Sequence, residues 1–292
     1  MILGGIEAGG TKFVCVVGTE KGEILERKRI PTTTPDETLK AVIEFFQDKQ
    51  IEGLGIASFG PVAVDPDHPQ YGSILKTPKL AWADTPILHI LTDALKCPAA
   101  IDTDVNAAAL AEAKKGNAWD VKTCLYLTIG TGIGGGFYHG DLLHGRLHPE
   151  MGHILLPIGQ DGFEGICPFH GNCLEGLVSG PAIEARAGKK AELIQEDDPL
   201  WNEVVNTIAQ ALVNYQMVLS PERIILGGGV MHQCHLFPRI HREFYRLING
   251  YLPFTEDEVK HHIVSPGLND DTGSVGALML AVKSLEDTGR VR

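Results

Sequence analysis

The sequence lacks the features that would place the protein in a membrane, direct it to secretion or bind it to nucleic acid. It has no run of about 18 apolar residues, so no segment is predicted to span a membrane. Residues 1–7 include neither the basic stretch nor the apolar core of a signal peptide. Lysine and arginine form no cluster and the formal net charge is -12, so nucleic acid and anionic membrane surfaces are not expected as partners. A phosphorylated ligand would therefore depend on backbone N–H groups, metal ions and helix N-termini.

Low-complexity segments and clear flexible linkers are also missing. The 292 residues are too many for one small core and suit two domains, and a hydrophobic content of 43% allows each domain to bury a core. Two of the six cysteines, Cys15 and Cys124, stand inside apolar stretches, where a reduced and buried thiol is expected. Together with the missing secretion signal, these thiols predict a cytoplasmic protein.

The first part of the chain alternates strand-like and helical patterns, which is typical of an α/β protein. Short apolar stretches bounded by turn residues predict the strands, and apolar residues at helical spacing predict the helices. The predicted strands cover 2–6, 13–18, 23–30, 53–57 and 99–102, and the predicted helices cover 35–47 and 105–114.

A related pattern recurs from residue 123. A strand at 123–129 is followed by a glycine turn at 130–135, a strand at 136–139 and a hairpin turn at 140–141. The order of strand, glycine turn, strand, hairpin and strand thus occurs twice, as expected for two homologous α/β lobes facing a cleft. The remaining predicted elements are helices at 201–219, 233–249 and 272–285 and a strand at 223–226.

The boundary between the two lobes is predicted near 115–122. The N-terminal lobe would cover residues 1–116 and the C-terminal lobe residues 117–271. The final helix, at about 272–292, is rich in alanine and glycine on one side and can pack back on the first lobe.

The first of three glycine-rich elements, residues 5–12, joins two predicted strands. It differs from a P-loop and from the dinucleotide-binding fingerprint, because both of those open a helix. Its glycines can turn sharply and present N–H groups to an anion, and Thr11 can add a hydroxyl. Glu7, at the end of the strand, can hold a hydrated metal ion. An ordinary glycine hairpin is the alternative interpretation.

The second and third glycine-rich elements point to a nucleotide. Residues 128–136 contain five glycines and two threonines, a composition that costs backbone entropy and that a plain turn rarely needs. A backbone cradle for a phosphate is the better explanation. Residues 227–229 are three glycines between an apolar strand and a helix. Close approach of an adenine or ribose explains them as well as an ordinary strand-to-helix turn does.

A cluster of polar residues follows the predicted strand at 99–102. Asp102, Asp104 and Asn106 lie where an apolar strand ends and a helix begins, and α/β sheets bind ligands at such strand ends. A carboxylate there can accept the proton of a sugar hydroxyl as the hydroxyl oxygen attacks phosphorus. Capping of the helix by Asp104 is the alternative.

Four potential zinc ligands lie within 21 residues, namely His153, Cys167, His170 and Cys173. Two spacings of two residues favour a tetrahedral zinc, and the site would be closed and structural because the protein supplies every ligand. A lone buried histidine with inert thiols is the alternative. The other histidines, including His144, show no such spacing and are interpreted as structural or solvent-exposed.

Two glutamates, Glu150 and Glu175, lie next to this cluster in the sequence. Carboxylates accept paired sugar hydroxyls well, and a segment ordered by metal would hold them in place. Solvated glutamates are the alternative, because that is the usual state of this residue type.

Together these elements resemble the ROK (repressor, ORF, kinase) family over nearly the whole chain. The matching segments, in order, are 5–12, 58–61, 104–109, 128–136, 149–153, 167–175 and 227–230. The resemblance implies a two-lobed actin-like ATPase fold, built from duplicated ribonuclease H-like lobes with a cleft between them. It also implies ATP with Mg²⁺, a structural Zn²⁺ in an insertion at about 148–176, and phosphorylation of a hexose at its 6-hydroxyl. A homodimer is implied by the resemblance alone.

The resemblance also implies a role for each matching residue, with Asp104 as the general base. The residues implied in sugar binding are Asn106, Glu150, His153, Glu175, Ser58, Gly60 and Pro61. Those implied in binding ATP and its metal are Glu7, Gly9, Gly10, Thr11, Lys12, Gly130, Thr131, Gly132, Gly134, Gly228 and Gly229. The implied zinc ligands are His153, Cys167, His170 and Cys173.

Within the family, the chain is most similar to the fructokinase branch, because of Gly-Ile-Glu-Ala-Gly-Gly-Thr-Lys, Ser-Phe-Gly-Pro and Cys-Pro-Phe-His-Gly-Asn-Cys. Glu7 stands where the family usually has Asp, which leaves the position of Mg²⁺ open. Fructose is the implied substrate, and the alternatives are a glucokinase, a mannokinase, an N-acetylhexosamine kinase and a sugar sensor that does not bind DNA. A DNA-binding repressor is not expected, because the first strand begins at residue 2 and the chain is acidic.

Overall fold

The computed structural model describes residues 1–77, 79–145 and 147–289. The chain forms an α/β structure that divides into two compact units. Unit 1 consists of Met1–Trp119, Tyr138–Pro149 and Gly267–Arg292, and unit 2 consists of Asp120–Phe137 and Glu150–Pro266. Among the described residues, no helix is both long enough and apolar enough to cross a membrane.

Unit 1 is built on a five-stranded mixed sheet in the order β3-β2-β1-β4-β5. The pairs β1–β2 and β2–β3 are antiparallel, whereas β1, β4 and β5 run parallel. The strands are β1 (Ile2–Ala8), β2 (Lys12–Thr19), β3 (Ile24–Pro31), β4 (Gly53–Ser58) and β5 (Ala99–Thr103). The helices of this unit are α1 (Pro35–Phe46), α2 (Ile87–Leu95), α3 (Asp104–Lys115) and α9 (Thr272–Asp287).

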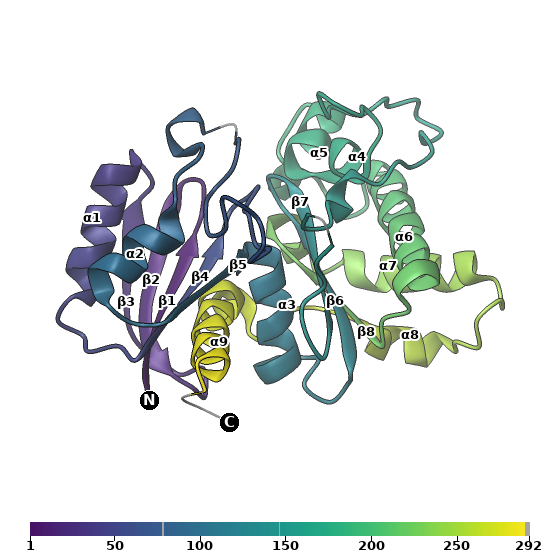
Figure 1. Ribbon diagram of the computed structural model, residues 1–292. Helices are drawn as coiled ribbons and strands as arrows, with labels where there is room; N and C mark the ends of the chain where they lie inside the picture. Colours follow the sequence, from purple (N-terminus) through teal and green to yellow (C-terminus); the bar gives the residue numbers. More distant parts are fainter. Residues whose placement is uncertain (78, 146, 290–292) are drawn as a thin grey trace. The chain divides into compact units, whose positions relative to one another are not determined.

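The two faces of this first sheet are covered in different ways (Figure 1). One face packs against α1 and α2 through large apolar side chains, among them Phe13, Ile56, Leu39 and Leu91. These side chains are buried, so this face contributes the hydrophobic core that stabilises the unit.

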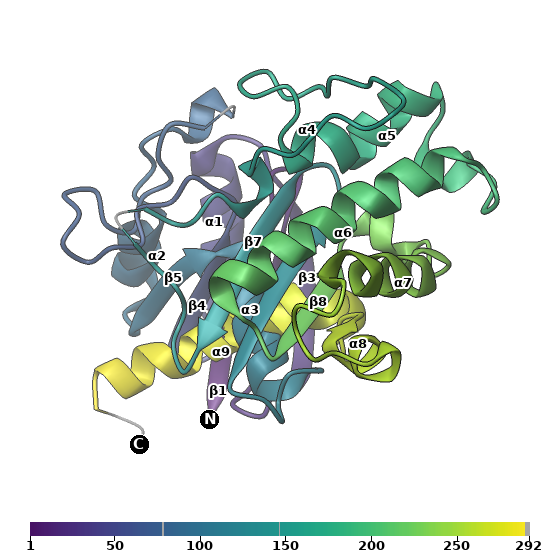
Figure 2. The same ribbon diagram turned by 90° about the vertical axis from the view of Figure 1, so that its right-hand side faces the viewer.

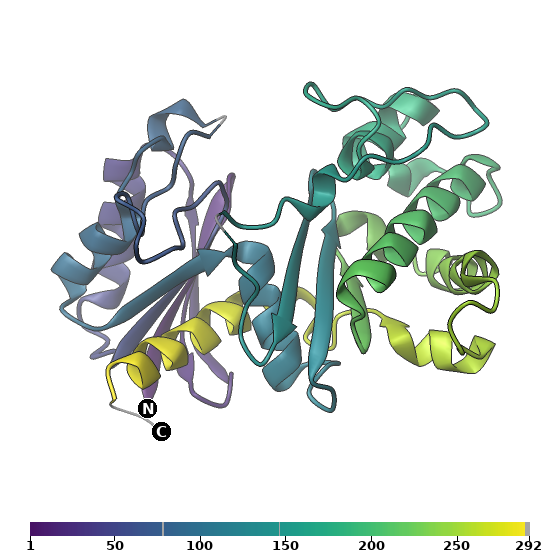
Figure 3. The ribbon, with the colours of Figure 1, turned by 45° about the vertical axis from the view of Figure 1, so that its right-hand side comes forward.

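The opposite face of the sheet is lined by glycines and packs against α9, which lies along the strands in Figure 3. A Cβ atom on Gly55 would lie 1.8 Å from the carbonyl oxygen of Ala277, and one on Gly53 would lie 3.1 Å from that of Ala281. Side chains do not fit between β4 and the helix. The close approach therefore requires glycine in the strand and small residues in the helix.

Unit 2 contains a four-stranded sheet in the order β7-β6-β8-β9, in which β6, β8 and β9 are parallel. This order repeats that of the first sheet without the outer strand β3. The strands are β6 (Thr123–Ile129), β7 (Ile133–His139), β8 (Arg223–Gly227) and β9 (Ile263–Val264). The helices are α4 (Leu174–Val178), α5 (Gly180–Ala187), α6 (Leu200–Leu219), α7 (Leu236–Ile248) and α8 (Glu256–His262). Figure 2 shows α6 crossing one face of the sheet, with α7 and α8 beside it.

Three predicted boundaries in this part of the chain are wrong. The glycine turn predicted at 130–135 is shorter, because β7 begins at Ile133 and includes Gly134. A third strand was expected after the hairpin turn at 140–141. Among the described residues, the structure has only an isolated β-bridge there, between Tyr138 and Leu142. The helix predicted at 233–249 begins at Leu236, after a short 3-10 turn at Gly229–His232.

The segment 138–149 belongs to unit 1, whereas the sequence placed all of 117–271 in the second lobe. Long-range contacts explain the difference. The Lys283 ammonium donates a hydrogen bond to Asp141, and the Lys114 ammonium lies 5.5 Å from the centre of the Tyr138 ring. Residues 267–271 also belong to unit 1. Such contacts join residues far apart in the chain, so local composition does not reveal them.

Candidate active site

Three segments of unit 1 leave the sheet at the same edge. In the parallel register Ala8 lies opposite Ser58, and Ser58 lies opposite Thr103, so β1, β4 and β5 end side by side. The carboxyl ends of parallel strands are where α/β proteins bind ligands. The sheet edge thus brings together most predicted site residues of this unit, namely Gly9, Gly10, Thr11, Lys12, Ser58, Gly60, Pro61, Asp104 and Asn106.

The turn between β1 and β2 is closed by main-chain hydrogen bonds. The Gly9 N–H donates to the Lys12 carbonyl at 3.0 Å, and the Thr32 hydroxyl donates to the Gly9 carbonyl at 2.7 Å. A Cβ atom on Gly9 would lie 2.8 Å from the Lys12 carbonyl oxygen, so glycine is needed for the tight turn. Thr11 and Lys12 are exposed beside it.

Glu7, the last residue but one of β1, lies close to the first turn of α9. The Ser274 hydroxyl donates to the Glu7 carboxylate at 3.3 Å, and a Cβ atom on Gly273 would lie 2.7 Å from the Glu7 carboxyl carbon. Glycine at 273 therefore leaves the room that the longer glutamate side chain occupies. Burial raises the pKa of Glu7 above its ordinary value, and the hydrogen bond from Ser274 and the charges of Lys12 and nearby arginines oppose this shift. A hydrated cation beside this half-buried carboxylate would favour its charged form.

The helix α3 places Asp104 in its first turn as an exposed carboxylate. The N-cap of this helix is Thr103, whose hydroxyl accepts a hydrogen bond from the Asn106 N–H at 3.2 Å. The cap is therefore not Asp104, and capping does not explain why an acid stands at this position. The Asp104 carboxylate accepts a hydrogen bond from the Val105 N–H at 2.9 Å.

Next to Asp104 in the chain, the predicted polar cluster of Asp102 and Asn106 gains a third member, His144, that was not predicted from the sequence. The Nε2 atom of His144 lies 2.8 Å from a carboxylate oxygen of the buried Asp102, and the Asn106 amide donates to the other oxygen at 2.9 Å. The hydrogen bond to Asp102 raises the pKa of His144. The interpretation of His144 as a merely structural or exposed residue was therefore incomplete, because the 42 residues that separate it from Asp102 leave no local signal.

A second buried carboxylate in unit 1, Glu112 of α3, was also missed. It accepts the N–H groups of Asn117 at 2.8 Å, Gly267 at 2.9 Å and Leu268 at 3.2 Å, and the Thr272 hydroxyl at 3.2 Å. Asn117 and Gly267 stand near the points where the chain leaves unit 1 and returns to it. Glu112 thus holds both chain segments within unit 1.

In unit 2, three glycine-containing segments converge beside the end of β6. Gly228 has a φ of +88°, and a Cβ atom there would lie 2.5 Å from the Ile129 carbonyl oxygen. The Gly180 N–H donates to the Gly130 carbonyl at 2.7 Å, and a Cβ atom on Gly130 would lie 3.7 Å from the Gly229 nitrogen. Gly180 opens α5, so a helix N-terminus adjoins the turn that contains Gly130, Thr131 and Gly132. The sequence analysis did not identify Gly180.

Glu175 links this glycine turn to the histidine and cysteine residues. One of its carboxylate oxygens accepts the Ile133 N–H at 2.9 Å, and the other lies 4.0 Å from the His153 Nε2. A Cβ atom on Gly132 would lie 2.8 Å from the first oxygen, so a side chain there would displace the Glu175 carboxylate. Burial raises the pKa of Glu150, and the negative charge of Glu175 adds to the shift while His153 opposes it.

The four predicted zinc ligands form one cluster, because one donor atom from each of His153, Cys167, His170 and Cys173 lies within 4.8 Å of all the others. The Nδ1 atom of His153 lies 3.4 Å from the Cys173 sulfur and 3.9 Å from the Cys167 sulfur, and the Nδ1 of His170 lies 3.7 Å from the latter. A tetrahedral zinc with bonds of about 2.3 Å to sulfur and about 2.0 Å to nitrogen separates such atoms by about 3.6 Å. The donor set and its spacing fit zinc, and they leave the Nε2 of His153 free to face Glu175.

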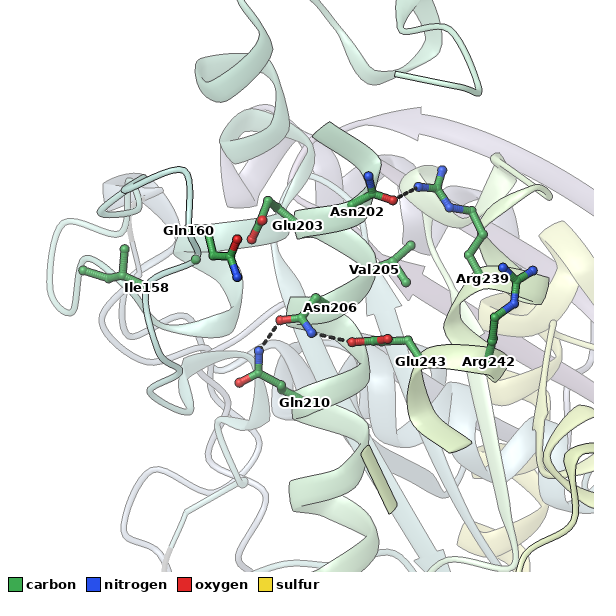
Figure 4. Close-up of a pocket in the computed structure, with 11 residues that line it drawn as sticks. Ile158, Gln160, Asn202, Glu203, Val205, Asn206, Gln210, Arg239, Arg242 and Glu243 are labelled. Carbon is green, nitrogen blue, oxygen red and sulfur yellow. Dashed lines mark hydrogen bonds between the residues drawn. The ribbon is translucent and has the colours of Figure 1, made fainter. Parts of the chain in front are cut away.

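A separate groove in unit 2 contains none of the predicted site residues. It lies between α6, α7 and the loop at 158–160, with a volume of about 420 Å³ (Figure 4). Asn206 donates to Glu243, and Arg239 donates to Asn202, so polar groups of the groove pair with one another. Its mixed charges do not favour one type of ligand.

Two α/β units with the same strand order, a glycine turn in each and an acid at the strand ends define a two-lobed protein of the actin-like class. The chain belongs to the ROK family, whose family model matches residues 3–284. The predicted fold class and the resemblance to this family are confirmed.

Individual relatives match almost the full length. A putative fructokinase of Bacillus subtilis (strain 168) is 48% identical over 98% of this chain and 97% of its own. A fructokinase of Pediococcus pentosaceus is 45% identical over 98% of this chain and all of its own. The crystal structure of a ROK hexokinase from Thermus thermophilus superimposes with a TM-score of 0.80 at 26% identity, covering 98% of this chain and 100% of that one.

Proposed function

We propose that the protein is an ATP-dependent kinase that transfers a phosphoryl group to the 6-hydroxyl of fructose. The observation that carries the proposal is Asp104, an exposed acid at the carboxyl ends of three parallel strands that is not the cap of its own helix. Membership of the ROK family and the relatives named fructokinase, at 48% and 45% identity, support the sugar and the reaction.

On the donor side, we propose that glycine turns hold ATP. The main chain at 130–132 and the N-terminus of α5 offer N–H groups and a positive helix end to phosphates. The turn at Gly9–Gly10 with Thr11 and Lys12 would contribute in the same way. The adenosine would lie at Gly228 and Gly229, and the last of these has open space around the position of a Cβ atom.

Glu7 would hold Mg²⁺ through water, as a carboxylate two residues before the turn at Gly9. When bound, the metal neutralises charge on the phosphates. Within the protein, the Ser274 hydroxyl and the room left by Gly273 fix the position of the Glu7 carboxylate. Gly134 lies within β7 and would support the phosphate turn through the strand.

On the acceptor side, Asp104 would take the proton of the 6-hydroxyl as the oxygen attacks the γ-phosphorus of ATP. Glu150, Glu175 and the Nε2 edge of His153 would bind the other hydroxyls. Asn106, predicted to bind the sugar as well, is fully buried and would order the region around the sugar instead. Ser58 is buried and its hydroxyl donates to the Phe59 carbonyl at 2.9 Å, so its contribution would be to shape the loop that carries Gly60 and Pro61.

The zinc would be structural, held by Nδ1 of His153 and His170 and the sulfurs of Cys167 and Cys173. It would order the segment that carries Glu150 and Glu175, and all four coordination positions would be filled by protein. A homodimer in the cytoplasm is part of the same proposal, supported by the family and by the free cysteines.

A coupled assay of ADP release tests the proposal on a panel of fructose, glucose, mannose, N-acetylglucosamine and N-acetylmannosamine. We expect the highest kcat/KM with fructose, and fructose 6-phosphate as the product. If another hexose is turned over with a higher kcat/KM, that hexose and not fructose is the preferred substrate. Failure to turn over any sugar would remove the kinase function.

A further inference from the structure

We infer that His144 is a positioning residue for phosphoryl transfer, which holds Asp104 in place through the buried pair of Asp102 and Asn106. The inference rests on the proposed function, in which Asp104 is the general base.

The three side chains come from separate segments and meet within hydrogen-bonding distance. Asp102 belongs to β5, Asn106 to the first turn of α3, and His144 to the segment 138–149. The Nε2 of His144 lies 2.8 Å from Asp102 Oδ2, and the Nδ2 of Asn106 lies 2.9 Å from Asp102 Oδ1. Asn106 is fully buried and Asp102 is 4% exposed, whereas 30% of the His144 side chain is exposed.

The contacts define where the hydrogens lie. The Asp102 carboxylate only accepts, so we assign the hydrogen to the Nε2 of His144, which donates it to Oδ2. The Nδ2 of Asn106 lies 3.2 Å from the same Nε2, and with this tautomer it donates to Asp102 alone. The Asn106 amide must direct its nitrogen at Oδ1, because the opposite orientation would set two oxygens against each other. The carboxylate accepts a third hydrogen bond from the Thr103 N–H at 2.8 Å.

The Oδ1 atom of Asn106 shows that the hydrogen bond to Asp102 sets the orientation of the amide, although that orientation does not satisfy all of its hydrogen-bonding groups. Its Oδ1 atom is buried and has no hydrogen-bond partner among the described residues. An unpaired buried oxygen costs free energy, so it persists only where the surrounding groups impose it. Asp102 imposes it here, and His144 in turn fixes Asp102.

The network closes around the turn that carries Asp104. The backbone N–H of Asn106 donates to the Thr103 hydroxyl, and its side-chain amide donates to Asp102. These hydrogen bonds connect residues on both sides of residue 104. The position of the Asp104 backbone follows from these bonds. A shift of about 1 Å in a catalytic group can cost a rate factor on the order of 100.

The segment that brings His144 is anchored at a second point. Asp141 accepts a hydrogen bond from the Lys283 ammonium of α9. The charged groups that face His144 are therefore Asp102 on β5, Asp141 on its own segment and Lys283 on α9. Both anchors lie within unit 1, so the imidazole is held against Asp102 by contacts on either side.

Steady-state kinetics of His144→Leu and His144→Gln with fructose and ATP test the inference. We expect His144→Leu to lower kcat by about tenfold or more and to leave the KM for ATP within about twofold, because the phosphate turns are untouched. His144→Gln should recover most of kcat, since its amide N–H can donate to Asp102. In the Asp102→Asn background, His144→Leu should add little further loss, because the two residues act as one unit.

The control is His139→Leu, an exposed histidine of the same segment, which should behave like the wild type. If His144→Leu does not fold, His144→Asn keeps a polar side chain but is too short to reach Asp102, and it should show the same loss. An active wild type with unchanged kcat in these variants, or a Gln variant as slow as the Leu variant, would overturn the inference. A wild type inactive on every hexose would instead overturn the proposed function.

Discussion

Unit 1 and unit 2 repeat one strand order but hold their candidate site residues by different means. In unit 1 the residues follow strands β1, β4 and β5, which are mostly buried and whose register places Ala8, Ser58 and Thr103 in one row. In unit 2, Glu150 lies in an irregular stretch after β7, and Glu175 lies in the first turn of the short helix α4 that follows this stretch. That stretch exposes large apolar side chains, such as Phe169 at 85%, and under the proposed function a zinc bound by the cluster of four ligands would order it.

The difference shows that two units with the same strand order can position their site residues by different interactions. Strand register and buried hydrogen bonds position the acid of unit 1. A metal would do the same for the glutamates of unit 2, where regular elements are too short to do so. Unit 1 should therefore be sensitive to single hydrogen bonds, and unit 2 to loss of the metal.

The largest expected effect is the loss of zinc. We expect about one zinc per chain in freshly purified protein, and Cys173→Ser should lose the metal, lower the melting temperature and leave 150–176 open to proteolysis. Structural zinc supplies on the order of 10 kcal/mol in small zinc peptides, and regular elements in this segment are short. Elemental analysis and thermal melting measure both effects.

The control for this variant is Cys234→Ser, an exposed cysteine outside the cluster, which should change neither zinc content nor melting temperature. Freshly purified protein without zinc would contradict the prediction and would remove the proposed difference between the units.

The second expected effect is on turnover. Asp104→Asn should lower kcat by a factor on the order of 100 to 10,000, because it removes the proposed general base. Fructose binding should stay measurable by calorimetry, and the melting temperature should change little because the side chain is exposed. Normal turnover in this variant would exclude Asp104 as the base.

A third, smaller effect is expected at the converging glycines of unit 2. Gly228→Ala should raise the KM for ATP by about tenfold or more and lower stability. The new methyl group would lie 2.5 Å from the Ile129 carbonyl oxygen at a φ of +88°. Gly250→Ala is the matched control, with a φ of +74° but nothing within 4 Å of the Cβ position. Equal KM values for ATP in the two variants would argue against a nucleotide site at Gly228.

The smallest effect concerns pH and the site of unit 1. The pKa of His144 is raised in the folded protein by its hydrogen bond to Asp102. The resulting stabilisation is complete below the unfolded value near 6.5 and is lost as the pH rises through the folded value. The melting temperature of the wild type relative to His144→Gln should therefore be highest near pH 6 and should decline toward pH 9. A difference that is constant over this range would show that His144 is not protonated beside Asp102.

The sequence by itself determined the elements that depend on local pattern. Alternating strands and glycine turns predicted the duplicated α/β architecture, and the spacing of His153, Cys167, His170 and Cys173 predicted a cluster that the structure assembles. These features follow from backbone periodicity and from ligands that lie near one another in the chain.

Only the tertiary structure decided which distant groups meet. The pairing of His144 with Asp102, the hydrogen bond from Gly267 to Glu112, and the contact of Gly180 with the turn at Gly130 join residues 42 or more positions apart. The return of 138–149 to unit 1 depends on such contacts as well. Each contact forms because folding brings a donor and an acceptor together away from water. The residues next to each partner in the sequence do not indicate which distant residue it will contact.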